Sequence, residues 1–315
     1  MNWKCLQTIL MLLAVAGLSQ SCIKDDLEDC EHVSLYFRYL ADSTKNVLSD
    51  YMDRVDLYVY DEHNNLVQTR TYDKSELKNC ATPKFRLAPG RYHVMAVGNQ
   101  EDRTRLVNYS GGDFKFMYLT HPSLTSRAAT TIEGFDSNYL GHKDIVVPEN
   151  VNFRDTVVFH CAHTDVDVTI RDLHDEGEES LYEKFNKGYS LVFEGAYSQT
   201  SVLNQVGEQQ VTVVPRLMYD GPRLEYTTVD LNLYRFGKHS PLVMSIVNNN
   251  TGEVLIRETM DHFIARFPRV ITYLNREEAR LPIVITFGHG KVTIEPPHWT
   301  VDDITGDWEF GEDPK

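Results

Sequence analysis

Alternation of apolar and polar residues with a period of two is the feature that most limits what this chain can fold into. Val33, Leu35 and Phe37 alternate with more polar neighbours, and residues 55–60 repeat the pattern. Successive side chains of a β-strand point to opposite faces of its sheet, so the pattern predicts strands with one buried face. The pattern returns along most of the chain, and the sequence therefore predicts an all-β protein.

Turn residues separate the predicted strands. The run Asp-Glu-His-Asn-Asn at 61–65 predicts a hairpin that leads into Leu66–Tyr72, and 248–252 predicts a second hairpin leading into 254–258. Pro89-Gly90 lies between two β-rich runs. Proline fixes φ near about −65° and glycine accepts a positive φ, so we expect a type II turn there.

A region of different character separates two series of strands. Residues 100–150 are polar and irregular, with only a weak helical stretch at 124–129, and predict an insertion in the first domain. We place the domain boundary at 148–150. The second series comprises the segments 157–159, 166–170, 189–193, 210–214, 224–234, 242–247, 254–258, 282–287 and 291–295, with a short helix or a loop at 261–274. This spacing predicts two tandem β-sandwiches, residues 32–150 and 151–315.

The N-terminus has the form of an export signal. It carries one charged residue, Lys4, and an apolar run at 10–18 that is too short for the roughly 20 residues that a membrane span needs. Small and polar residues then lead into Cys22, as at a lipoprotein processing site. We therefore expect residues 1–21 to be a lipoprotein signal peptide and Cys22 to carry lipid. The alternative is an ordinary cleaved signal beside an unmodified cysteine.

Residues 22–31 form an acidic tether with no strand or helix pattern. Its segment Lys-Asp-Asp-Leu-Glu-Asp at 24–29 resembles the acidic signal that sends lipoproteins of Bacteroidota to the cell surface. We therefore expect a surface-exposed, lipid-anchored protein of the outer membrane, with the periplasmic face as the alternative. Several acyl chains hold a protein firmly, whereas one holds it reversibly.

The remaining cysteines are Cys30, Cys80 and Cys161, once Cys5 leaves with the signal and Cys22 is lipidated. An exported protein can form disulfides. A bond between Cys30 and Cys80 would close a loop of about fifty residues, worth roughly 4 kcal/mol on chain-entropy grounds. Cys161 lies among alternating apolar residues and is expected to be buried as a small apolar side chain. Other pairings of the three thiols stay open.

Charge and motifs exclude several function classes. The chain has a net charge of −15, and removal of residues 1–21 takes away one lysine, leaving 294 residues at −16. Nucleic acid requires basic patches, so we expect no nucleic-acid partner. The sequence contains no HExxH, paired CxxC or Gly-x-Ser-x-Gly motif. His160 and His163 are three apart on a predicted strand and point to opposite faces, so they cannot share a metal ion. We expect no enzyme, no catalytic residue, no metal and no cofactor.

The order of these features resembles the FimB-like fimbrillin-anchor family, the minor-fimbrium anchoring subunits of Bacteroidota. The features are the lipoprotein cysteine, the acidic tether, Leu-Ala-Pro-Gly-Arg-Tyr at 87–92 with Gly98-Asn99, and a second β-domain with tryptophans near its end. The resemblance covers Cys22 to Trp308. It implies two transthyretin-like sandwiches, a fimbrial shaft subunit (pilin) as partner, and a role in anchoring a fimbrium to the outer membrane and limiting its length.

Strand exchange joins the shaft subunits of such systems, so the resemblance implies that a terminal strand contacts the partner. In this chain we expect that contact at Trp299, Val301, Ile304 and Trp308. The alternative is that this segment packs on its own domain.

Two other functions remain open at this stage. Tyrosines such as Tyr36, Tyr58, Tyr60 and Tyr72 would suit a surface glycan-binding lipoprotein if they formed an exposed aromatic surface. A polymerising or tip pilin of the same fold would lose its N-terminal strand to an Arg- or Lys-specific protease. Arg38, the first arginine after Cys22, lies inside the first predicted strand, which favours retention of the N-terminus.

Overall fold

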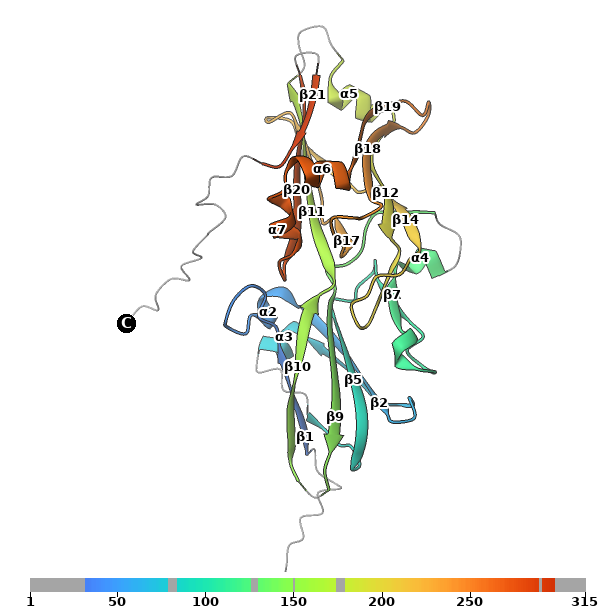
Figure 1. The fold of residues 1–315 in the computed structure, drawn as a ribbon, viewed down its shortest axis with the longest axis vertical. Helices are drawn as coiled ribbons and strands as arrows, with labels where there is room; N and C mark the ends of the chain where they lie inside the picture. Colours follow the sequence, from blue (N-terminus) through green and yellow to red (C-terminus); the bar gives the residue numbers. More distant parts are fainter. Residues whose placement is uncertain are drawn as a thin grey trace, which may run out of the picture.

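The structure, a computed structural model, describes residues 32–78, 84–125, 130–149, 151–173, 179–288 and 291–297. The described chain is mostly β-structure in several sheets, with short helices (Figure 1). The molecule is elongated: a lower lobe contains β1, β2, β5, β9 and β10, and an upper lobe contains β11, β12 and β18–β21 (Figure 1). The prediction of a β-protein is confirmed, whereas the transthyretin-like pairing of two sandwiches stays a prediction.

A seven-stranded sheet forms the lower lobe. Its order is β3-β2-β5-β9-β10-β1-β4. The strand β10 pairs in parallel with β1 through Phe153–Val158 and antiparallel with β9 through Phe159–Cys161, so it carries the sheet around a core. The strands are β1 (Val33–Arg38), β2 (Arg54–Asp61), β3 (Leu66–Asp73), β4 (Lys84–Phe85), β5 (Gly90–Gly98), β9 (Tyr139–Val147) and β10 (Phe153–Cys161).

The core of the lower lobe follows the predicted alternation. Val33, Leu35 and Phe37 of β1 are buried, and Phe37 packs edge-on against Phe159 and Tyr72. The predicted hairpin of β2 and β3 is confirmed by their antiparallel register. The helices α2 (Leu48–Tyr51) and α3 (Lys74–Lys78) each bury one leucine against this core.

Three further sheets belong to the upper part of the molecule. A six-stranded sheet has the order β15-β16-β11-β20-β21 with β17 beside β11, a five-stranded sheet has the order β19-β18-β12-β14-β8, and a three-stranded sheet has the order β13-β7-β6. Their strands are β6 (Arg105–Val107), β7 (Tyr118–Thr120), β8 (Thr131–Ile132), β11 (His163–Leu173), β12 (Tyr189–Tyr197), β13 (Gln199–Ser201), β14 (Gln210–Val213), β15 (Leu217–Asp220), β16 (Glu225–Thr228), β17 (Asn232–Tyr234), β18 (Val243–Asn248), β19 (Val254–Thr259), β20 (Ala279–Gly288) and β21 (Lys291–Glu295).

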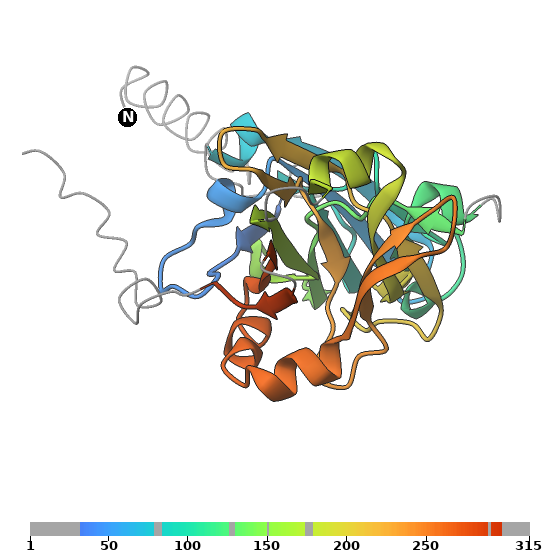
Figure 2. The same cartoon turned by 90° about the horizontal axis from the view of Figure 1, so that it is seen from above.

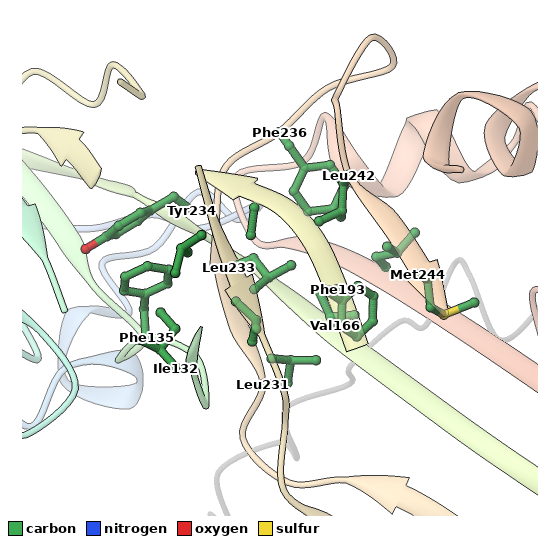
Figure 3. Close-up of a cluster of buried hydrophobic side chains, with 14 of the residues drawn as sticks. Ile132, Phe135, Val166, Phe193, Leu231, Leu233, Tyr234, Phe236, Leu242 and Met244 are labelled. Atoms are coloured by element: carbon green, nitrogen blue, oxygen red, sulfur yellow. The ribbon is translucent and has the colours of Figure 1, made fainter. Parts of the chain in front are cut away.

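The upper lobe packs these sheets around a second core, part of which is drawn in Figure 3. Phe135 stacks on Tyr234 with ring centroids 4.0 Å apart, and Phe193 of β12 and Met244 of β18 belong to the same cluster. The same apolar cluster continues to Met95 on the outer face of the lower sheet. The two lobes therefore share apolar packing as well as a chain connection.

Short helices complete the upper part. α6 (Met260–Arg266) is capped by Thr259, whose side chain accepts a hydrogen bond from the backbone of His262, and α7 (Val270–Leu274) follows it. Both lie along one outer side of the molecule (Figure 2), and they confirm the helical alternative predicted for 261–274. The others are the 3-10 turn η2 (Phe114–Phe116), α4 (Pro122–Thr125) and α5 (Leu181–Asn186).

One strand connection joins the lobes directly. β10 ends at Cys161 and β11 begins at His163, so the chain leaves one sheet and enters the next at Ala162. The seven-stranded sheet thus includes residues on both sides of the boundary expected at 150/151. The division of the chain into domains stays a prediction.

The structure corrects two local predictions. The expected turn at Pro89-Gly90 was wrong: Gly90 has no positive φ and begins β5, while the preceding β4 pairs with β1 at the other side of the sheet. The Tyr92 hydroxyl donates a hydrogen bond to the Ala88 carbonyl at 2.8 Å, which fixes the crossing between the two strands. The region 100–150 also contains more than irregular structure, because β9 pairs with β5 along nine residues.

Candidate functional site

The residues that the sequence singled out for lipid, disulfide and partner contact lie outside the described part of the chain. These are Cys22, Cys30, Cys80, Trp299, Val301, Ile304 and Trp308. Lipidation of Cys22, the Cys30–Cys80 bond and the terminal contact stay predictions. The described residues contain other candidate features: an open sheet edge at β21, a polar joint between the two lobes, and clusters of titratable side chains.

The strand β21 is the last described strand and lies at an edge of the six-stranded sheet. It pairs with β20 from Gly288–Lys291 to Val284–Glu295, and no other strand of the described chain pairs with it. An edge strand presents backbone groups to which another strand can add. β21 leads directly towards the residues 299–308 expected to contact a partner.

A charged network ties β21 to its neighbours. The Arg266 guanidinium of α6 donates to the carbonyl of Ile294 at 3.1 Å and to the Glu258 carboxylate at 3.0 Å. His262 lies 2.6 Å from the other oxygen of Glu258, which is itself buried. Arg266 therefore connects β19, α6 and β21, and partly covers the open edge.

The first strand is held on both sides. All six residues of β1 pair with β10, Val33 and Ser34 also pair with β4, and Arg38 stands opposite Val158. A protease binds its substrate as an extended and accessible backbone, which a strand inside a sheet cannot offer. Cleavage at Arg38 would therefore require prior opening of the lower sheet.

The joint between the lobes contains a half-buried carboxylate, Glu278. The hydroxyl of Tyr39, which follows β1, donates a hydrogen bond to Glu278 Oε1, and the hydroxyl of Tyr139 of β9 lies 3.2 Å from the same oxygen. Tyr39 and Tyr139 are buried, and their rings meet edge-on. Glu278 directly precedes β20, so this contact links the lower sheet to the upper one.

Burial controls the ionisation of this cluster. It raises the pKa of Glu278 above the ordinary value, although the hydrogen bonds from Tyr39 and Tyr139 act in the opposite direction. Burial and the nearby carboxylate also raise the pKa of both tyrosines, so their hydroxyls remain protonated donors.

Neighbouring contacts reinforce the joint. Glu277 accepts a hydrogen bond from the backbone of Cys161 at 2.9 Å and pairs with His160 at 3.3 Å. The Arg235 guanidinium donates to the backbone carbonyls of Leu274, Arg276 and Glu277. The segment before β20 is thus held by both lobes. No local sequence pattern indicates this joint, because its members are up to 239 positions apart.

Cys161, His163 and Glu278 also come close enough to suggest a metal site. Burial raises the pKa of the Cys161 thiol, so it stays protonated and is a poor ligand. His163 Nδ1 lies 3.1 Å from the Asn138 carbonyl, and the Glu278 carboxylate accepts hydrogen bonds from the hydroxyls of Tyr39 and Tyr139. This cluster is a hydrogen-bonded core element, and the prediction that Cys161 is buried is confirmed. His160 and His163 do face apart: the first is largely exposed, whereas the second is buried.

The tyrosines considered for glycan stacking do not form one surface. Tyr60 and Tyr72 are buried, whereas Tyr36 is 43% exposed. Tyr58 is half-buried, and burial raises its pKa to about 12. These rings mainly cover sheet faces.

A cavity of about 620 Å³ lies beside the joint. It includes Glu101, Asp136, Asp165, Asp167 and Asp230, with Arg103 as the one cation in its lining. Its acidic lining suits a cationic group better than an anionic one.

Comparison with known proteins gives a family match over most of the chain. The model described as "Mfa2: Fimbrillin-A associated anchor proteins Mfa1 and Mfa2" matches residues 27–305. No curated protein matches the sequence.

Solved structures share the fold at low sequence identity. A proposed adhesin from Bacteroides ovatus is 16% identical with a TM-score of 0.66, over 85% of this chain and 94% of the other. A proposed polysaccharide-binding protein from Bacteroides thetaiotaomicron is 14% identical with a TM-score of 0.63, over 83% and 95%. The fimbrial anchor protein Mfa2 from Porphyromonas gingivalis is 11% identical with a TM-score of 0.57, over 83% and 95%.

Proposed function

Since the chain belongs to the Mfa2 family of fimbrial anchor proteins, we propose that it is the membrane-bound end of a fimbrium, held by lipid on Cys22. The family is a structural, non-enzymatic one. The observation that carries the proposal is the family match over residues 27–305. Association with a fimbrillin follows from the family. The residues that make the contact are proposed below.

The position of β1 supports attachment through the N-terminus. Ten residues lie between Cys22 and Val33, and the chain from one to the other spans at most about 40 Å. The lower lobe would therefore stay close to the membrane surface, and the upper lobe would extend away from it. Among the described residues, no helix is long and apolar enough to cross a membrane.

The pairing of the first strand supports an anchor over a polymerising pilin. Arg38 is paired within β1, and Leu35 and Phe37 are buried in the lower core. A pilin that polymerises by strand exchange must release such a strand. In this chain its release would expose the core of the lower lobe.

We place the pilin contact on β21 and on the segment 298–315 that follows it in the sequence. β21 is an edge strand of the upper lobe, and strand addition at an edge supplies backbone hydrogen bonds. Trp299, Val301, Ile304 and Trp308 would provide the apolar side chains that fix the register.

Deletion of residues 298–315 tests this contact. We expect the shortened chain to remain folded and membrane-bound but to lose co-purification with the pilin. A chain that carries alanine at Trp299 and Trp308 should show the same loss more weakly. Undiminished co-purification after the deletion would place the contact elsewhere on the molecule.

The anchoring role is tested in cells by Cys22→Ala, with Ser21→Ala as the matched control. We expect the Cys22→Ala strain to release long fimbriae into the medium, seen by electron microscopy, and the Ser21→Ala strain to keep them. Attached fimbriae of normal length in the Cys22→Ala strain would contradict the anchor. Loss of fimbriae altogether would instead indicate a tip or shaft subunit.

A further inference from the structure

Three potential metal ligands meet on the outer face of the lower sheet. His93 belongs to β5, and His142 and Asp144 belong to β9. The two strands pair antiparallel, with His93 opposite Asp144 and Met95 opposite His142. Residues directly opposite share a face, as do residues two apart on one strand. The register of β5 and β9 therefore directs all three side chains to the same side.

The ligand atoms lie within reach of one another. His93 Nδ1 is 2.6 Å from Asp144 Oδ1, and His142 Nε2 is 3.1 Å from the same oxygen. One ligand atom from each residue lies within 4.8 Å of the other two. Zinc binds imidazole nitrogen and carboxylate oxygen at about 2.0–2.2 Å in a tetrahedron, which puts the ligand atoms roughly 3.3 Å apart. Small side-chain movements would bring the three atoms to that spacing.

The surroundings hold the two imidazoles in place. The Phe114 ring of η2 lies 4.4 Å from the His93 ring and 5.7 Å from the His142 ring, centroid to centroid. The His93 and His142 side chains are 27% and 30% exposed, whereas Asp144 is 64% exposed. The rings are thus oriented by a rigid sheet and an aromatic neighbour, and solvent can still reach the carboxylate. An ion can therefore enter without opening the fold.

We propose that His93, His142 and Asp144 form a binding site for a divalent transition-metal ion, with Zn²⁺ as the occupant. Two imidazoles and one carboxylate are a ligand set that zinc accepts readily. His93 would bind the ion through Nδ1 and keep its proton on Nε2, and His142 would bind through Nε2 and keep its proton on Nδ1. A fourth coordination position would face solvent and take water or a side chain from a docked protein.

The site is independent of the anchoring role. It lies on the lower lobe, away from β21, and none of its ligands takes part in the joint at Glu278. No sequence motif indicates the site, because His93 and Asp144 are 51 positions apart and only the pairing of β5 with β9 brings them together.

Zinc titration of the full mature chain, freed of metal with a chelator, tests the proposal. Asp144→Asn is the main variant, because it preserves the shape of an exposed side chain and removes the anionic ligand. His239→Ala is the matched control, because His239 is an 83% exposed histidine that lies 3.7 Å from Asp261. Circular dichroism checks that each variant is folded.

We expect the wild-type chain and His239→Ala to bind one Zn²⁺ with equal affinity. Loss of an outer partner of a metal ligand typically weakens binding by about 10- to 100-fold, so loss of the ligand itself in Asp144→Asn should weaken it by at least about tenfold. Zinc should also raise the melting temperature of the wild-type chain but not that of His93→Ala. Equal affinity of Asp144→Asn and wild type, or equal weakening by His239→Ala, would overturn the proposal.

Discussion

Removal of the Glu278 carboxylate should uncouple the two lobes at a measurable cost. In Glu278→Ala the hydroxyls of Tyr39 and Tyr139 lose their common acceptor. A hydrogen bond to a charged group contributes about 1.5–3 kcal/mol, and a buried donor left without a partner costs about 1–3 kcal/mol. Relief from burying a charge offsets part of this loss. We therefore expect the free energy of unfolding to fall by about 2–4 kcal/mol.

Glu278→Gln is the matched control. Its amide oxygen still accepts a hydrogen bond, and no charge is buried, so its stability should lie within about 1 kcal/mol of wild type at pH 7. Urea unfolding at 25 °C measures all variants. A double-mutant cycle with Tyr39→Phe should show strong coupling, since both substitutions remove the same contact. A loss below about 1 kcal/mol in Glu278→Ala, or strict additivity in the cycle, would refute the assigned role of this carboxylate.

The same residue gives a pH dependence. Because the pKa of Glu278 is raised in the folded protein, the folded state retains a proton that the unfolded state releases above the ordinary value of 4.5. The stability of wild type relative to Glu278→Gln should therefore be greatest below pH 4.5 and should fall as the pH rises through the raised pKa. A stability of wild type relative to Glu278→Gln that rises with pH would contradict this prediction.

Three other expectations concern Gly141, Arg266 and the Cys30–Cys80 bond. A methyl group at Gly141 would lie 2.7 Å from Val157 Cγ1, so Gly141→Ala should lower the free energy of unfolding by about 1–3 kcal/mol, whereas Gly111→Ala, with open space around it, should not. Arg266→Ala should cost about 1–2 kcal/mol and speed hydrogen exchange in β21, and the exposed Arg257 paired with Glu194 should change stability by less than about 0.5 kcal/mol when replaced. If Cys30 and Cys80 are bonded, alkylation of the denatured, unreduced chain should modify Cys161 alone, as intact-protein mass spectrometry would show; modification of three thiols would contradict the bond.

Local sequence patterns predicted the strands whose two faces differ in polarity. In β1 and β11 buried side chains alternate with less buried ones, and both strands coincide with expected strands. β2 also coincides with an expected strand, although Asp56 and Tyr60 on its predicted polar face are buried as well. β9 did not show this signal, because Gly141 interrupts the apolar face and His142, Lys143 and Asp144 are all polar. Its place at the centre of the sheet depends on pairing with β5 and β10, which no local pattern records.

Strand order and polar contacts between distant segments could not be predicted from the sequence either, because both depend on pairing that no local pattern records. Pro89-Gly90 predicted a turn, but the segments on its two sides pair with different strands, so the chain crosses the sheet there. Glu278 lies in the charged run Arg-Glu-Glu-Ala-Arg at 276–280, which is typical of an exposed loop. Its partial burial arises only when Tyr39 and Tyr139 are brought to it by the fold.

Mass spectrometry of the mature protein from its native outer membrane tests the central claim most directly. The account predicts an N-terminal Cys22 that carries diacylglycerol, with β1 and Arg38 retained in the same chain. A mature N-terminus at a cleaved arginine or lysine downstream of Cys22 would make the protein a polymerising pilin and would contradict the anchor.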